Sequence, residues 1–465
     1  MKPSARFHSA RNALNGRIIW PILLVLFLAP FAFGSTKPAF WALWSTILFG
    51  CGAYFFARMA MLDAKFRVSP RSMPASLALF AALGLYMLVQ IVPLGSLAPA
   101  MPAGSQGALE LGSGAISLTP NDTLIAAMRW ATYGLLFFLV LQATANQQRA
   151  QLFLKILFWG IVFHAIIALL FLLQFGDTIL GIPKWKYFGD ALGGFINRNS
   201  FATFLAMGCV VGLNFLLPGN DAATKTRGAR PVKIGRDTVF IGVGLLILLV
   251  ALIATNSRMG AFAAICGMAM SLGLAFSKRM DGLAGFRAWP LVVLLLAAIV
   301  FAVVTYGATF TERLGRAGDD AAIRQQLYAQ VIDMIRLRPL LGYGGDSFEY
   351  VFPLFHRPPV NVDLVWSKTH STYLALWSDY GLIFGSLPII LAGLLFFQLL
   401  STHRMLAGQD ALIRCGIGVI VTGAVHSLVD FSLEIEAVTF VFVAVLAVAC
   451  ARGFEVRNAV REENP

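Results

Sequence analysis

The chain has 465 residues, of which 58% are hydrophobic and only 13% are charged, and its mean hydropathy is +0.75. This composition is too apolar for a water-soluble domain, so lipid must be the solvent of most of the chain. A net charge of +13 could indicate nucleic-acid binding, but a basic membrane protein more often retains its lysines and arginines in cytoplasmic loops. The five cysteines show no CxxC or His/Cys cluster and indicate neither disulfides nor zinc.

Apolar segments close to the ~20 residues needed to cross a bilayer recur along the whole chain. We therefore predict one membrane domain, all-α and polytopic, with about twelve transmembrane helices. An even number of spans places both termini on one side of the membrane. The predicted spans are about 18–33, 39–57, 75–93, 123–143, 152–175, 199–217, 238–254, 259–276, 289–306, 372–400, 411–431 and 437–451.

Basic residues lie in alternate connections between these spans. The connections after the second, sixth, eighth and tenth spans are basic, as are both ends of the chain, whereas the segment between Leu94 and Asp122 has no Lys or Arg. Because basic residues accumulate in the cytoplasm, we expect an inner-membrane protein with cytoplasmic N- and C-termini. The chain then divides into 1–306 with nine helices, a periplasmic loop at 307–371, and 372–465 with three helices and a cytoplasmic tail.

The predicted periplasmic loop is hydrophilic, and its basic residues are nearly matched by acidic ones, so it does not resemble a nucleic-acid-binding patch. Within it, apolar residues at Ile323, Leu327, Val331 and Ile335 recur with helical spacing. This pattern predicts an amphipathic helix over 321–337 that lies on the membrane bundle. A proline and several glycines follow and should end the helix.

Two arginines are predicted at the outer mouth of the bundle, where ionisable side chains cost free energy and are therefore functional candidates. Arg198 lies between Asn197 and Asn199 at the start of the sixth span, and Arg258 lies in the tight turn between the seventh and eighth spans. A guanidinium stays charged and can donate two hydrogen bonds to phosphate oxygens, which suits a diphosphate. The alternative is that each arginine only reaches the lipid headgroups.

Histidines mark two further places. His370 lies where the periplasmic loop re-enters the membrane, and an imidazole with an ordinary pKa of about 6.5 can take a proton from a hydroxyl at neutral pH. A lone histidine is also often structural. His426 and Asp430 lie four residues apart on the eleventh predicted span, hence on one helix face. We expect a structural His–Asp hydrogen bond there, with a metal site as the less favoured alternative.

Taken in order, these segments resemble the O-antigen ligase and polymerase family, whose members share the so-called Wzy-C region. The resemblance covers residues 185–435 in detail and the whole chain in topology. Each motif is short, and their order and shared side of the membrane strengthen the match. The matching segments are Asn197-Arg198-Asn199, Ser257-Arg258, Arg324 with Arg338-Pro339, Thr369-His370 and the string from His426 to Asp430.

The resemblance implies a metal-independent, inverting glycosyltransferase that needs no cofactor and serves lipopolysaccharide or exopolysaccharide biosynthesis. Its donor would be an undecaprenyl-diphosphate-linked glycan, and its acceptor a glycan or lipid A-core. Periplasmic arginines would bind the diphosphate, and the loop histidine would activate the acceptor. Carried over by position, the diphosphate-binding candidates are Arg198, Arg258, Arg324 and Arg338, with Asn197 and Asn199 beside them, and the base is His370. One departure concerns the acceptor side, because the family usually has Asn where this chain has Ser371.

Several alternatives stay open. Within the family, a ligase joins polysaccharide to lipid A-core, whereas a polymerase extends lipid-linked repeats, and the sequence does not distinguish them. A transporter or flippase of lipid-linked oligosaccharide could also be a basic protein with twelve spans, although its charges would be expected near the bilayer midplane. A metal-dependent glycosyltransferase usually carries an acidic pair in its first outer loop, and the corresponding 34–38 segment has no carboxylate.

Overall fold

The computed structural model describes residues 3–98, 114–217, 235–276, 317–360, 365–406 and 410–463. These residues are almost entirely helical. The first helices are α1 (Pro3–Leu28), α2 (Pro38–Met61), α3 (Pro74–Gln90), α4 (Pro120–Ala143), α5 (Gln147–Leu173), α6 (Arg198–Leu216), α7 (Arg236–Ala254) and α8 (Arg258–Phe276). They are followed by α10 (Ala317–Leu337), α11 (Phe348–Val351), α12 (Thr372–Gly385), α13 (Leu387–Met405), α14 (Ala411–Ser427) and α15 (Glu436–Glu463).

The remaining elements are short. The strands β1 (Thr178–Ile179) and β2 (Ile182–Pro183) form an antiparallel hairpin in which Thr178 pairs with Pro183. Single turns of 3-10 helix are η1 (Ala29–Phe31), η2 (Pro70–Ser72), η3 (Gly95–Leu97), η7 (Phe352–Leu354) and η8 (Ser432–Glu434).

The prediction of an all-α polytopic membrane protein is confirmed. Nine helices of the described ranges are long and apolar enough to cross a membrane, and the shorter apolar helices α3 and α14 lie among them. These eleven helices correspond to eleven of the predicted spans. The ninth predicted span, 289–306, lies outside the described residues.

The tenth predicted span, 372–400, was wrong as a single helix. The chain forms two helices there, α12 and α13, and α12 contains a kink at Gly381, whose φ is +72°. The kink allows backbone to approach backbone, because a Cβ at Gly381 would lie 2.3 Å from the carbonyl oxygen of Leu340. A hydropathy pattern cannot register this break, since both helices are apolar.

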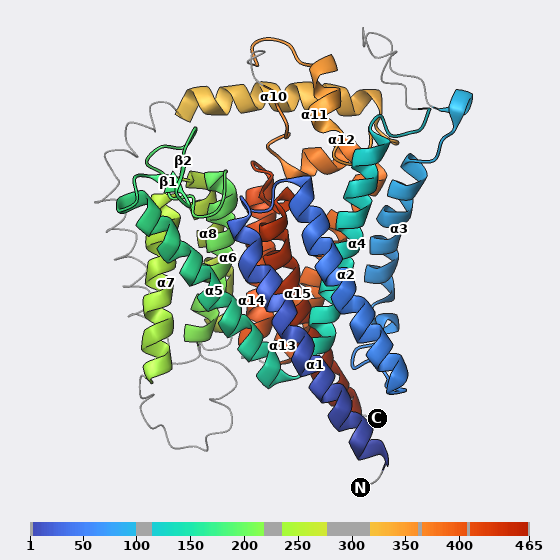
Figure 1. The fold of residues 1–465 in the computed structure, drawn as a ribbon, viewed down its shortest axis with the longest axis vertical. Coiled ribbons are helices and arrows are strands. Elements are labelled where there is room, and N and C mark those ends of the chain that lie inside the picture. Colours follow the sequence, from blue (N-terminus) through green and yellow to red (C-terminus); the bar gives the residue numbers. More distant parts are fainter. Residues whose placement is uncertain are drawn as a thin grey trace.

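The helices form a bundle that α10 crosses at one end (Figure 1). Helices α11 and α12 lie at the same end, which we call the α10 end, and both chain termini lie at the opposite end (Figure 1). Helices α6 and α15 run through the middle of the bundle, and 83% of the apolar stretch of each helix is buried inside the protein. The predicted amphipathic helix over 321–337 is confirmed as the larger part of α10, and its buried side chains Leu327, Val331 and Met334 pack in one cluster with side chains of α11 and the segments next to it.

Candidate active site

The start of α6 presents Arg198 at the α10 end of the bundle. Asn197 caps the helix, because its side-chain oxygen accepts a hydrogen bond from the backbone N–H of Asn199 at 2.7 Å. The Arg198 guanidinium donates to Oδ2 of Asp190 at 2.7 Å and lies over the ring of Tyr187, 5.2 Å from its centroid. The side chain remains 24% exposed, so part of the guanidinium can still be reached from outside.

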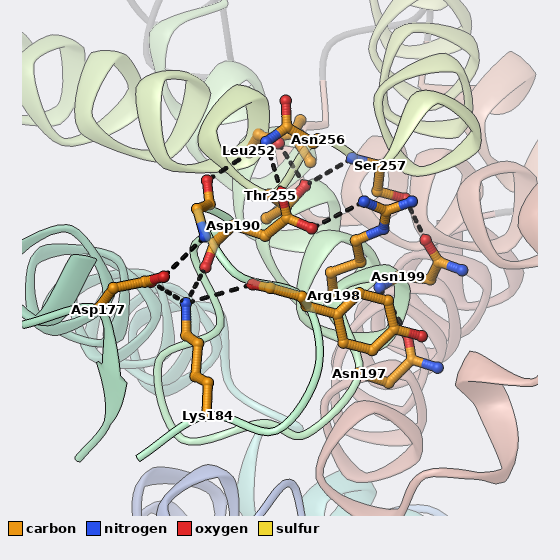
Figure 2. Close-up of polar contacts among 12 residues, drawn as sticks. Asp177, Lys184, Asp190, Asn197, Arg198, Asn199, Leu252, Thr255, Asn256 and Ser257 are labelled. Carbon is orange, nitrogen blue, oxygen red and sulfur yellow. Dashed lines mark hydrogen bonds and ion pairs between the residues drawn. The ribbon is translucent and has the colours of Figure 1, made fainter. Parts of the chain in front are cut away.

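The loop between α5 and α6 holds Asp190 in place (Figure 2). The Lys184 ammonium, whose side chain is 1% exposed, pairs with the Asp177 carboxylate and donates to the carbonyl oxygen of Asp190 at 2.5 Å. The other Asp177 oxygen accepts the backbone N–H of Gly189 at 2.7 Å. These contacts within the loop hold it together as one unit against the start of α6.

The turn between α7 and α8 contacts the same unit (Figure 2). Asn256 donates from its side chain to Oδ1 of Asp190 at 2.6 Å, and the Ser257 hydroxyl donates to the side-chain oxygen of Asn199 at 2.8 Å. Arg258 is the next residue, exposed at the first position of α8, and it makes no hydrogen bond or ion pair with another described residue. The two arginines predicted to act together are therefore brought to adjoining segments.

His370 lies in the segment that leads into α12 and adopts a left-handed backbone conformation, with φ at +56°. Its ring packs edge-on between Trp366 and Phe431, with centroid distances of 5.7 and 5.1 Å, and its carbonyl oxygen accepts the Tyr328 hydroxyl at 2.8 Å. The ring Nδ1 is buried and has no hydrogen-bond partner among the described residues.

Burial lowers the pKa of His370 to about 4; the nearby Asp430 carboxylate acts against this shift and the Arg324 guanidinium adds to it. The imidazole is therefore neutral at physiological pH, as a proton acceptor must be. Arg324 itself reaches from α10 to the carbonyl oxygen of Val429 at 3.2 Å.

The turn 428–432 after α14 joins the two sets of residues. Oδ1 of Asp430 accepts the side-chain N–H of Asn199 at 3.0 Å, and its backbone carbonyl accepts the N–H of Thr372 at 3.2 Å. The next residue, Phe431, supplies the ring that packs on His370. The start of α6 and the segment that carries the histidine are thus held to one turn.

The guanidiniums of Arg198 and Arg324 both act on the pKa of the Tyr187 hydroxyl. Burial raises its pKa, and the guanidiniums of both Arg198 and Arg324 act in the opposite direction. Arg324 donates to Val429, Asn199 donates to Asp430, and His370 packs on Phe431, so Arg198, Arg324 and His370 share one polar region around the turn 428–432.

Arg338 lies elsewhere. It follows the end of α10, fourteen residues from Arg324, which corresponds to about 21 Å along a helix. Its guanidinium is buried, donates to the carbonyl oxygen of Ile116 at 3.1 Å and packs over the ring of Tyr343. The structure does not bring this arginine together with the other three.

The expected direct hydrogen bond between His426 and Asp430 was wrong, because each side chain has other partners. The Nδ1 of His426 pairs with the Thr203 hydroxyl at 2.5 Å, and the Asp430 carboxylate is taken up by Asn199 and Ser432. The reason is that α14 ends at Ser427, so Asp430 is not on the helix face that the four-residue spacing assumed. Both residues still connect the last part of the chain to α6.

A buried ionic network was not predicted from the sequence. Lys368, two residues before the histidine, lies 3.3 Å from Asp346 and 3.0 Å from Glu434, and Arg129 of α4 pairs with the other Asp346 oxygen at 2.7 Å. Burial alone would lower the pKa of Lys368, but the Glu434 and Asp346 carboxylates raise it above its usual range. The only sequence signal was a single arginine inside an otherwise apolar span.

The glycines after α10 allow close packing against α12. A Cβ at Gly342, whose φ is +65°, would lie 2.4 Å from the carbonyl oxygen of Asp379, and the neighbouring backbone donates to that part of α12. This contact positions Asp346, which follows the glycines, within the ionic network. Ser371, which departs from the family pattern, turns its hydroxyl toward the carbonyl oxygen of Ser427 at 3.3 Å.

The fold and this region define a polytopic helical membrane protein with a polar, arginine-containing site at one end of its bundle. A family model described as O-antigen ligase matches residues 243–390. The match covers about a third of the chain and supports the resemblance to the O-antigen ligase family that the sequence motifs predicted. The matched residues include Arg258, Arg324, Arg338 and His370, whereas Arg198 and Asp430 lie outside them. No curated protein matches the chain.

Proposed function

We propose that the protein transfers a glycan from an undecaprenyl-diphosphate carrier to a sugar hydroxyl at the periplasmic face of a bacterial inner membrane. The ligase or polymerase character follows from the family region. The observation that carries the proposal is the shared polar region in which Asp190, Asn199 and Asp430 hold Arg198, the Arg258 turn and His370 together.

The arginines would act on the leaving group. As the bond between sugar C1 and the phosphate oxygen breaks, negative charge accumulates on the diphosphate, and fixed guanidiniums at the bundle end stabilise it. Arg198 is fixed by Asp190 and Tyr187, and Arg258 is exposed beside it with its donors available. Arg324 is close enough to contribute positive charge, whereas the buried contacts of Arg338 favour a structural role.

His370 would act on the acceptor. Its neutral imidazole can take the proton of the attacking sugar hydroxyl. The acceptor oxygen then bonds to C1 from the face opposite the departing diphosphate, which inverts the anomeric configuration. No metal ion is needed in this scheme, because the guanidiniums supply the positive charge.

The side of the membrane is inferred from charge. The basic connection after α2 lies beside the N-terminal helix, since Arg11 donates to the carbonyl oxygen of Lys65 at 3.1 Å. Both termini lie at this end, away from α10 (Figure 1). If these basic residues are cytoplasmic, the α10 end with its arginines and histidine is periplasmic.

The test is a transfer assay with purified, reconstituted protein, a lipid-linked oligosaccharide donor and candidate glycan or lipid A-core acceptors. We expect transfer with inverted anomeric configuration, equal rates with and without chelator, and loss of transfer in His370→Ala. His356→Ala is the matched control, because this second histidine of the α10 end stacks on Phe352 outside the site.

Three outcomes would contradict the proposal. Full transfer by His370→Ala would remove the base, and loss of transfer in chelator would favour a metal-dependent enzyme. Movement of the lipid-linked glycan across the bilayer without formation of a glycosidic bond would favour a flippase. The acceptor that is used distinguishes a ligase, which takes lipid A-core, from a polymerase, which takes lipid-linked repeats.

A further inference from the structure

The loop between α5 and α6 exposes large apolar side chains outside the transmembrane helices. We call residues 174–190, which include the β1–β2 hairpin, the hairpin loop. Its exposed side chains are Phe175, Ile182, Trp185 and Phe188, with exposed fractions of 58, 45, 53 and 64%. Four large apolar side chains exposed to water in one short loop would be unfavourable, so they indicate contact with something other than water.

The exposed side chains continue a surface of α5. Along this helix the exposed apolar residues recur every three or four positions, which places them on one face. They are Trp159, Phe163, Ile166, Leu170 and Leu173. In a helix that crosses a membrane, an exposed apolar stripe of this kind faces lipid. Because the stripe reaches the last residue of α5 and the loop begins at the next one, the apolar surface runs from the bilayer core into the hairpin loop.

The inner side of the loop is tied to the candidate active site. Ile179 is buried, and the Lys184 ammonium holds both Asp177 and the carbonyl oxygen of Asp190 (Figure 2). Asp190 in turn binds Arg198 at 2.7 Å. The hairpin loop and the Arg198 guanidinium are therefore joined by direct contacts.

We propose that the hairpin loop inserts Phe175, Ile182, Trp185 and Phe188 into the boundary between headgroups and acyl chains of the leaflet at the α10 end, and so holds Arg198 at the level of the donor diphosphate. Aromatic side chains prefer this boundary, and apolar area buried in it supplies the binding free energy. Lys186, exposed on the same loop, can reach lipid phosphates. The second half of the proposal rests on the proposed function; the first half does not.

Insertion can be measured without any activity. Phe188→Trp and Tyr350→Trp each place an additional tryptophan at an exposed aromatic position, the first on the hairpin loop and the second on α11. In nanodiscs made with phospholipids brominated near the top of the acyl chains, we expect the added fluorescence of Phe188→Trp to be quenched and that of Tyr350→Trp to remain. Quenching that is no stronger at 188 than at 350 would overturn the proposal and leave the proposed function untouched.

The link to the donor needs a kinetic comparison. We expect Trp185→Ser with Phe188→Ser to raise the KM for the undecaprenyl-linked donor by about tenfold, a free-energy difference of about 1.4 kcal/mol, with little change in kcat. The KM for a water-soluble donor with the same glycan on a short prenyl diphosphate should not change. Tyr350→Ser is the matched control, and neither KM should change in it.

The outcomes separate the two ideas. An unchanged KM for the long-chain donor, despite quenching at 188, would overturn the role in positioning Arg198. An equal rise for both donors would mean that the loop contacts the glycan instead of the lipid, and would also overturn it. Quenching at 188 in a protein that transfers no glycan would refute the proposed function while leaving the insertion established.

Discussion

Replacing Lys368 by Met should destabilise the protein in a way that depends on pH. The ammonium lies 3.0 Å from Glu434 and 3.3 Å from Asp346, and the three side chains are only 16–25% exposed. Removing one partner of a buried pair leaves an uncompensated charge and typically costs 3–5 kcal/mol; because Lys368 keeps a quarter of its surface in contact with solvent, we expect about 3 kcal/mol.

The pH dependence follows from Glu434. Burial raises the pKa of this carboxyl, and Lys368 is the group that most opposes the rise. Without the lysine the folded-state pKa should rise further. A carboxyl whose folded pKa is raised favours folding when it is protonated, so the deficit of the variant should shrink as the pH falls from about 8 to 5.

The assay is thermal unfolding in detergent, followed by intrinsic fluorescence across this pH range, with Lys368→Arg and Arg336→Met as controls. Lys368→Arg retains the charge and should lose less stability. Arg336 forms an exposed pair with Asp333, which is worth about 0–1 kcal/mol, so its replacement should have little effect. A deficit in Lys368→Met that is the same at all pH values, or no larger than in Arg336→Met, would refute the electrostatic explanation.

Three further predictions concern the site and its support. Burial lowers the pKa of His370 to about 4, so the fold favours the neutral ring. The contribution of this neutral ring to stability is present above the ordinary pKa of 6.5 and is lost as the pH falls toward 4. The acid limb of kcat/KM in the wild-type protein should therefore lie near pH 4 and not near 6.5. Arg258→Lys should raise the donor KM by about tenfold without lowering the unfolding temperature, because an exposed lysine keeps the charge but loses the forked pair of donors; an unchanged KM would argue against contact with diphosphate. Gly342→Ala should cost at least about 1–3 kcal/mol, because its Cβ would lie 2.4 Å from the carbonyl oxygen of Asp379. The control is Gly393→Ala within α13, which has nothing within 4 Å and should not lower the unfolding temperature, because Ala favours a helix more than Gly does.

Most of the architecture followed from the sequence because a membrane imposes simple rules. Each span must be apolar and about 20 residues long, so hydropathy located eleven helices that the structure describes. What hydropathy could not locate was the break between α12 and α13, since the kink at Gly381 depends on a contact with Leu340, a residue far away in the sequence.

The candidate site was predicted in part. The motifs around Arg198, Arg258 and His370 could be recognised, and the structure brings these segments together. The partners that hold them there were missed. Asp190 belongs to no motif, and Lys368 lies in the segment of His370 but was given no role; their importance appears only when loops distant in the sequence meet. The roles of the motif residues in chemistry stay predictions.

The turn 428–432 has a consequence for biosynthesis. It contacts Asn199, Arg324 and the start of α12, although more than two hundred residues separate it from α6. A ribosome delivers the N-terminal helices to the membrane first, so Arg198 is inserted long before Asp430 has been translated. The nascent protein therefore carries Arg198 with its direct partners Asp190 and Tyr187, but without the turn that holds Asn199 beside the segment of His370. Chains that terminate before this turn should insert into the bilayer and yet leave the candidate site unassembled.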